Sequence, residues 1–184
     1  SGDSPYEMVE LDEGVDRSDI VVLSTPISDI DNVLKRVLEV PSDAIIFDIS
    51  SIKAPIARQL NEAARSGRKV CSIHPMFGPD ADSIFDRNVL VCDCGSQEAV
   101  EEITALFKDA GANLVRVDLE EHDELMSLVL GLTHALNLSF LRALTGSDFD
   151  LRELHRSSST TFNKQIGTTE DVANENPELY FDIQ

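Results

Sequence analysis

The chain has 184 residues, a hydrophobic content of 42%, and 34 acidic against 15 basic side chains, which gives a formal net charge of −19. Such a surface repels nucleic acid and anionic membranes, so we expect neither as a partner. We also expect no apolar run long enough to span a bilayer. The polar first residues lack a signal-peptide pattern, so the sequence favours a cytoplasmic location. The acidic excess is typical of a halophilic protein and equally of an acidic mesophilic one.

The first part of the chain alternates between short apolar runs and segments with helical periodicity. The apolar runs predict strands, the first of them buried on both faces, at residues 19–24, 44–48, 69–73, 88–92 and 113–117. Apolar residues at helical spacing predict helices at residues 28–38, 54–65 and 97–110. Ser28 is the expected N-cap of the first helix. This alternation indicates βαβ units, so we expect residues 1–117 to form a partial Rossmann-like α/β domain with a mostly parallel sheet.

After Val117 no further strand pattern occurs. A long helix is predicted over residues 119–144, and it is apolar around most of its circumference. Shorter helices are predicted at residues 151–156, at 161–173 and from Pro177 onward. A helix that is apolar all round is covered by other helices or by a second subunit. We therefore expect residues 118–184 to form an all-α domain that pairs with its mate in a homodimer.

The cysteines and glycines argue against two kinds of binding site, a metal site and a dinucleotide-binding loop. Cys71 and Cys92 fall in apolar runs and are expected to be buried free thiols. The Cys92-Asp93-Cys94 spacing is too tight for an ordinary zinc pair, so no metal site is expected. None of the nine glycines forms the dinucleotide-binding pattern G-x-G-x-x-G. We therefore expect a fragment that lacks the phosphate-binding loop. We expect the C-terminal end to be missing as well, because the sequence stops at Gln184 within a predicted helix.

One histidine is a candidate general base. His74 follows an apolar run and precedes Pro75, in the sequence S-I-H-P-M-F-G-P-D over residues 72–80. The prolines and Gly78 predict a stiff loop that projects the imidazole from the carboxyl edge of the sheet, where open α/β sheets bind ligands. The pKa of histidine lies near neutrality, which suits proton transfer. The alternative is a loop histidine that merely closes a strand end.

These residues resemble the prephenate dehydrogenase family, whose catalytic loop reads H-P-M-F-G-P-D. The other segments similar to that family stand in the same order along the chain: D-I-S-S-I-K at 48–53, E-H-D at 121–123, L-T-H-A at 132–135 and N-P-E-L-Y at 176–180. The resemblance implies a fold of the 6-phosphogluconate-dehydrogenase type, with an all-helical dimerisation domain. It also implies NAD or NADP as cofactor and oxidative decarboxylation of prephenate or arogenate in tyrosine biosynthesis.

The resemblance further implies roles for individual residues. His74 would accept the proton of the substrate hydroxyl, and Ser51 would orient that hydroxyl unless it caps the following helix instead. The residues expected to line the cofactor are Thr25, Pro26, Ser50 and Ser51. For His122 and Asp123, capping of the long helix is the favoured interpretation.

Substrate binding is expected from residues in both halves of the chain, namely His134, Arg87, Asn163 and Lys164. The alternatives are a satisfied core histidine for His134 and a surface salt bridge for Arg87. Asn163 stands where the family usually has an arginine, in the motif S-x-x-[FY]-R, that binds a substrate carboxylate. An amide cannot form that charged bidentate pair.

Two other functional hypotheses remain open. The chain is a non-catalytic dimerising remnant or ligand-binding fragment of such an enzyme, or it is a related dehydrogenase that acts on a different hydroxy acid. The missing phosphate loop motivates the first hypothesis, and Asn163 motivates the second.

Overall fold

The computed structural model describes residues 6–78 and 81–174. The chain divides into two compact units, residues 1–123 and residues 124–184, which are described separately below. The helix expected from Pro177 onward, the N-P-E-L-Y segment and the last two residues of the His74 motif, Pro79 and Asp80, lie outside the described residues.

The first unit is built on a five-stranded sheet in the order β1-β2-β3-β4-β5. Its strands are β1 (Ile20–Leu23), β2 (Ile45–Asp48), β3 (Val70–Pro75), β4 (Asn88–Asp93) and β5 (Asn113–Asp118). β1, β2 and β3 are parallel, β4 runs antiparallel to β3, and β5 is parallel to β4. The prediction of a mostly parallel α/β sheet is therefore confirmed.

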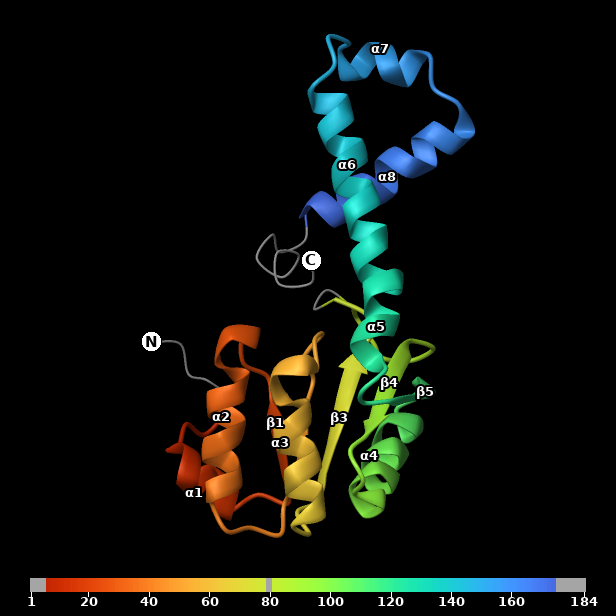
Figure 1. The fold of residues 1–184 in the computed structure, drawn as a ribbon. Helices are drawn as coiled ribbons and strands as arrows, with labels where there is room; N and C mark the ends of the chain where they lie inside the picture. The colour runs from red at the N-terminus through yellow and green to blue at the C-terminus, as the bar shows by residue number, and fades with distance from the viewer. Residues whose placement is uncertain (1–5, 79–80, 175–184) are drawn as a thin grey trace. The chain divides into compact units, whose positions relative to one another are not determined.

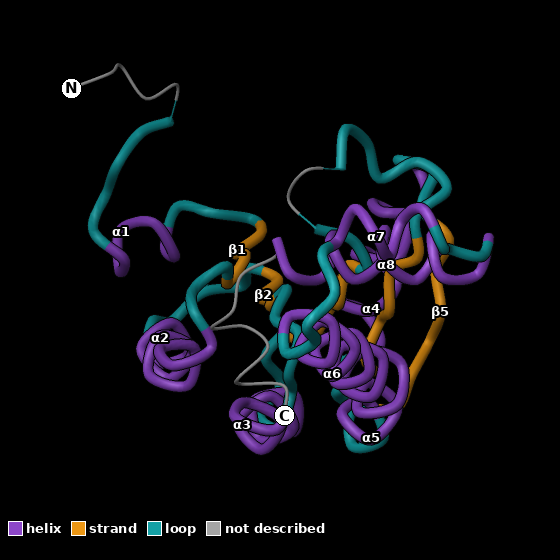
Figure 2. Tube along the Cα trace, turned by 90° about the horizontal axis from the view of Figure 1, so that it is seen from above, coloured by secondary structure: helices purple, strands orange, loops and turns teal. Residues whose placement is uncertain are grey.

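Four helices accompany the sheet: α1 (Leu11–Asp16), α2 (Ile27–Glu39), α3 (Ala54–Arg65) and α4 (Gln97–Asp109). α2 and α3 lie side by side on one face, whereas α4 covers the other (Figures 1 and 2). Successive strand residues point to opposite faces, so Ile46 packs in the core under α2 and α3 while Ile45 and Phe47 pack in the core under α4. These two apolar cores hold the helices against the sheet.

Two local predictions were wrong. β1 is an edge strand of the described sheet and is not buried on both faces, because Ile20 is 41% exposed and Val22 is 47% exposed. Ser28 does not cap α2, which begins at Ile27 after Pro26, and the Ser28 hydroxyl donates to the carboxylate of Asp29. Pro26 occupies the N-cap position instead, with φ −52° and ψ 149°, and makes no side-chain cap hydrogen bond.

The prediction for the cysteines was correct. Cys71 and Cys92 are buried free thiols within β3 and β4, and Cys94 is buried just after β4. Burial is the main reason that the pKa of Cys71 and the pKa of Cys92 are both raised to about 12. A thiol with so high a pKa stays protonated near neutral pH and is a poor nucleophile.

The second unit begins within a helix that runs from His122 to Thr145. It comprises α5 (His122–Met126), a π-helical segment η1 (Ser127–Leu132) and α6 (Thr133–Thr145), and is followed by α7 (Leu151–Arg156) and α8 (Thr160–Asn174). The predicted start at residue 119 was three residues too early. The Asp118 carboxylate accepts a hydrogen bond from the Glu120 amide at 3.1 Å, which forms a turn that keeps residues 119–121 out of the helix.

The helix from His122 to Thr145 is long and apolar enough to cross a membrane, which corrects the expectation that no such run exists. One helix of this kind is weak evidence for a membrane span, because core helices of soluble proteins can have the same length and composition. Only 11% of its most apolar stretch is buried within the described part of the chain.

A buried polar cluster joins α6 to α8. The Asn137 side-chain oxygen accepts hydrogen bonds of 2.8 Å from both Gln165 Nε2 and Thr169 Oγ1, and Asn137 Nδ2 donates to the Thr133 carbonyl oxygen at 2.8 Å. Asn137 and Thr169 are both nearly inaccessible to solvent. Because every buried partner in this cluster depends on Asn137, that side chain fixes how the two helices pack.

We expect Asn137→Ala to destabilise this helix pair by about 1–3 kcal/mol, because Thr169 would remain buried without its hydrogen-bond acceptor. Denaturant unfolding followed by circular dichroism measures the change. The control is Ser139→Ala, an exposed position on the same helix, which should leave stability almost unchanged. Equal effects of the two substitutions would show that the cluster does not hold α6 against α8.

Candidate functional site

A buried lysine ties the loop that follows β2 to strand β3. The Lys53 ammonium group donates to Asp48 Oδ1 at 2.7 Å, to the Ser50 carbonyl oxygen at 2.7 Å and to the Ile73 carbonyl oxygen at 2.8 Å. Lys53 and Asp48 are completely buried. Three acceptors match the three N–H donors of an ammonium group, so the buried charge is fully satisfied. The last acceptor is the residue directly before His74.

His74 lies inside β3, whereas the sequence predicted it in a loop beyond the strand. It is paired with Leu90 of β4 and is only 3% exposed. The reason is β4, whose antiparallel pairing continues β3 through His74 to Pro75. Proline is tolerated at this last strand position because little ladder pairing follows it. The imidazole is therefore held by a sheet and not by a stiff loop.

A second histidine contacts His74. The distance from His74 Nδ1 to His122 Nε2 is 3.0 Å, and His122 Nδ1 lies 2.7 Å from Asp123 Oδ1. His122 is completely buried. β5 runs parallel to β4 and therefore opposite to β3. Its last residue, Asp118, pairs with the end of β4, which lies beside the first half of β3. Residues 119–121 therefore lead the chain back along the sheet to bring His122 to His74.

Asp123 caps α3 from outside that helix. Its carboxylate accepts hydrogen bonds from the Lys53 amide at 2.8 Å and from the Ala54 amide at 2.7 Å. The expectation that His122 and Asp123 cap their own helix was wrong, and so was the alternative that Ser51 caps α3. Burial alone would raise the pKa of Asp123, but the hydrogen bonds from His122 and the two amides hold it below its usual value.

The surroundings keep His74 neutral. Burial first, then the positive charge of Lys53 and the neighbouring His122, lower the pKa of His74 from 6.5 to about 3, although Asp123 acts in the opposite direction. A folded-state pKa below the unfolded value means that the unfolded chain binds more protons. This contribution to stability is therefore complete above pH 6.5 and is lost as the pH falls toward 3.

The predicted cofactor residues stand where β1 and β2 end. Thr25 Oγ1 is buried without a hydrogen-bond partner among the described residues, and Pro26 immediately precedes α2. The Ser50 hydroxyl is engaged internally, with Asp48 Oδ1 at 2.6 Å and the Ile52 carbonyl oxygen at 2.9 Å. Ser51 is half-buried, and its hydroxyl makes no hydrogen bond within the described part of the chain. A ligand at this edge has Thr25 and Ser51 available to it, whereas Ser50 serves the fold.

The predicted substrate residues are divided between the units. Arg87 lies in the first unit, exposed, directly before β4, and forms no ion pair with any described residue. His134 lies half-buried on α6 in the second unit, whereas Asn163 and Lys164 are exposed on α8. Their part in substrate binding stays a prediction.

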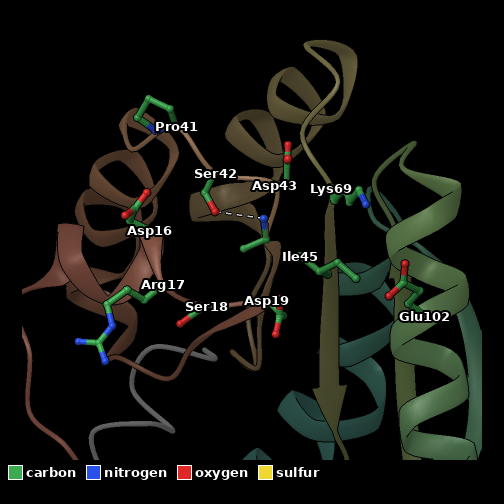
Figure 3. A pocket seen from close by; sticks show the side chains of 11 residues that line it. Asp16, Arg17, Ser18, Asp19, Pro41, Ser42, Asp43, Ile45, Lys69 and Glu102 are labelled. Atoms are coloured by element: carbon green, nitrogen blue, oxygen red, sulfur yellow. Dashed lines mark hydrogen bonds between the residues drawn. The ribbon is translucent and has the colours of Figure 1, made fainter.

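A cavity lies at the opposite edge of the sheet. It has a volume of about 750 Å³ and is lined by residues that precede the three parallel strands, among them Asp19, Asp43 and Lys69 (Figure 3). Open α/β sheets bind ligands at the carboxyl ends of their strands. This acidic hollow at the amino ends is therefore not the candidate site.

Sequence reasoning missed three members of the site, namely Lys53, His122 and Asp123. A usable signal was present for each. Lys53 ends the D-x-x-S-x-K segment, and His122 stands next to an acid in the E-H-D segment. Neither pattern reveals that Lys53 and Asp123, which are about 70 positions apart in sequence, are joined by a hydrogen bond.

Both parts of the chain match family models. Residues 6–116 match the model described as "Prephenate dehydrogenase, nucleotide-binding domain", and residues 118–184 match "Prephenate dehydrogenase, dimerization domain". A "Probable arogenate/prephenate dehydrogenase" of Methanocaldococcus jannaschii is 30% identical over 176 residues, which are 94% of this chain and 40% of that protein. The "T-protein" of Enterobacter agglomerans is 30% identical over 165 residues, 89% of this chain and 43% of that protein. The chain thus spans about two fifths of these curated relatives.

Solved structures share the fold. Prephenate dehydrogenase from A. aeolicus, in complex with hydroxyphenyl propionate and NAD⁺, superposes with a TM-score of 0.74 at 19% identity, covering 96% of this chain and 64% of that one. Synechocystis arogenate dehydrogenase gives a TM-score of 0.70 at 20% identity and covers 95% and 64%. Both support the arrangement of a Rossmann-like sheet followed by a helical region.

We expect Lys53→Met to destabilise the first unit by roughly 3–5 kcal/mol, because it leaves the Asp48 carboxylate buried without its counter-charge. Lys53→Met combined with Asp48→Asn should recover part of that loss. Thermal and denaturant unfolding measure both. The control is Lys69→Met, which removes an exposed ion pair with Glu98 and should change stability far less. If Lys53→Met lowers stability no more than the control does, the ammonium group does not hold the loop after β2 against β3.

Proposed function

This chain belongs to the prephenate dehydrogenase family, and from that membership we propose that it forms part of a cytoplasmic, NAD(P)-dependent oxidoreductase. The proposed reaction is the oxidative decarboxylation of prephenate or arogenate in tyrosine biosynthesis. The observation that carries the proposal is His74, which the structure holds neutral in β3 beside a His122–Asp123 pair. This arrangement favours the catalytic hypothesis over a non-catalytic remnant.

In the proposed reaction, His74 takes the proton of the substrate 4-hydroxyl as the carbonyl bond forms. The nicotinamide, when bound, accepts the hydride that leaves the same ring carbon. The bond between the ring and its carboxylate then breaks, carbon dioxide leaves, and the electron pair completes the aromatic ring. The ring oxygen recovers the proton from His74, so the histidine is regenerated. Aromatisation drives this sequence, which leaves the protein to align the groups and move one proton.

Ser51 is the proposed partner of His74 at the substrate hydroxyl. Its own hydroxyl is free of other hydrogen bonds among the described residues, as that role requires. Thr25 and Pro26 are proposed to line the cofactor, and the buried, unpartnered Thr25 Oγ1 fits a ligand that supplies its hydrogen bond. The side chain of Ser50 serves the loop, so its cofactor contact is proposed through the backbone.

The proposed substrate-binding residues are Arg87, His134, Asn163 and Lys164, with Arg87 meeting a substrate carboxylate and His134 donating a hydrogen bond. Asn163, which replaces the family's usual arginine, is the reason to test a second candidate, a related dehydrogenase for another hydroxy acid. Turnover of prephenate and arogenate should be compared with that of simple hydroxy acids under both NAD⁺ and NADP⁺. Activity on hydroxy acids alone would favour the second candidate.

We expect His74→Asn in the complete protein to lower kcat by roughly 10²–10⁴-fold, the usual contribution of a general base. Asparagine keeps a polar side chain of similar reach but cannot take a proton. Formation of reduced nicotinamide measures the rate. His155→Asn, at an exposed histidine of α7, is the matched control and should retain full turnover. Unchanged kcat in His74→Asn would remove His74 from the mechanism.

The helix from His122 to Thr145 is the proposed dimer contact. Leu128, Leu132 and Leu136 are 62%, 53% and 61% exposed. Residues three or four positions apart share one helix face, so these leucines form an apolar stripe. A stripe of this kind marks an interface, and a second copy of the chain buries both stripes at once around a two-fold axis.

We therefore expect the protein to be a dimer in light scattering at micromolar concentration, and Leu132→Glu to shift it toward monomer by placing a charge in the interface. Thr168→Glu, an exposed position on α8, should leave the mass unchanged. A soluble wild-type monomer would contradict the proposal, and a protein recovered only with membranes would favour a membrane contact for this helix.

A further inference from the structure

Asp123 fixes the direction of a chain of hydrogen bonds that ends at His74. An ionised carboxylate only accepts hydrogen bonds. The Asp123 oxygens accept from the Lys53 and Ala54 amides, and Oδ1 also lies 2.7 Å from His122 Nδ1. The proton of this third contact must therefore sit on His122 Nδ1, because Asp123 has none to give.

The same reasoning passes through His122 to His74. A neutral imidazole carries one N–H, so His122 Nε2 is left as an acceptor. That nitrogen lies 3.0 Å from His74 Nδ1, which must then carry the proton and donate it. His74 Nε2 is left with a free lone pair. Both rings are buried, so bulk water does not compete to reverse the arrangement.

We propose that His122 and Asp123 are positioning residues that hold His74 in the tautomer with its proton on Nδ1, so that Nε2 faces the reaction as a proton acceptor. This inference rests on the proposed function for its kinetic meaning, but the tautomer itself is a property of the folded chain. Asp123 is suited to the task because its bonds to the first turn of α3 and to the Lys53 amide fix its carboxylate in place.

This chain of hydrogen bonds from Asp123 through His122 to His74, here called the relay, also explains how a weakly basic imidazole can take a proton. The pKa of His74 is lowered to about 3, and the charged or titratable groups that act on it are Lys53, His122 and Asp123. Alone, such a ring is a poor base near neutral pH. If the proton on His74 Nδ1 moves to His122 as a substrate proton arrives on Nε2, the positive charge rests beside the Asp123 carboxylate and further from Lys53.

Asp123→Asn separates this role from a purely structural one. The asparagine oxygen still accepts from the α3 amides, and asparagine caps helices as well as aspartate does. Its NH₂ group, however, donates to His122 Nδ1. Every hydrogen bond in the chain then reverses, and His74 carries its proton on Nε2.

Isotope-edited nuclear magnetic resonance of the histidine ring nitrogens tests the proposal directly. In the wild type we expect His74 with a protonated Nδ1 and a bare Nε2 at neutral pH, and in Asp123→Asn the opposite. The kcat of Asp123→Asn should fall by roughly 10²–10⁴-fold with little change in KM. Asp109→Asn, at an exposed position of α4, should keep both the wild-type tautomer and kcat.

A wild-type His74 protonated on Nε2 would overturn the relay, and so would an Asp123→Asn protein with unchanged tautomer or unchanged kcat. If Asp123→Asn does not fold, the wild-type tautomer alone decides. A wild type that turns over neither prephenate nor arogenate would instead refute the proposed function, while the ring-nitrogen signals would still decide the relay.

Discussion

The Lys53 ammonium group is the constraint on which the site depends. A charge buried this deeply is tolerated only when each of its donors finds an acceptor. Here the acceptors are the Asp48 carboxylate and two carbonyl oxygens, at Ser50 and Ile73. Satisfying one cation therefore sets the path of the chain as it leaves β2 and the position of β3 directly before His74. The main-chain amide of the same lysine binds Asp123, so one residue links both ends of the histidine pair.

The helices and strands of the first unit were predictable because burial leaves a period in the sequence. Continuous apolar runs such as residues 44–48 became buried strands, and the segment before Ser66 became α3. Strand direction leaves no such trace. The antiparallel course of β4, which extends β3 over His74, depends on pairing between strands and not on the residues of either strand alone.

The site itself was only half predictable. His74 was predictable because a histidine followed by two prolines and a glycine is locally unusual, and Ser51 because it lies in a segment that resembles the family's D-x-x-S-x-K turn. For His122 and Asp123 the sequence predicts capping of their own helix, because that helix is the nearest one in the chain. Asp123 does cap, but it caps α3, about 70 residues away in sequence. Long-range hydrogen bonds of this kind carry no periodic signal, so a single sequence gives no reason to prefer the distant partner.

The buried thiols on β3 and β4, the strands that meet at His74, can report local opening of the structure around that residue. Cys71 lies on β3 and Cys92 on β4, both shielded from solvent and both with raised pKa. A thiol reagent can reach Cys71 only when α4 leaves its face of the sheet, and Cys92 only when α2 and α3 leave the other, because the closed cores offer neither access nor thiolate. Their rates of alkylation therefore report how often each helix layer opens next to the proposed base, without any added label. Ligands that stabilise the closed structure would lower the alkylation rate, and acid that protonates His74 would raise it.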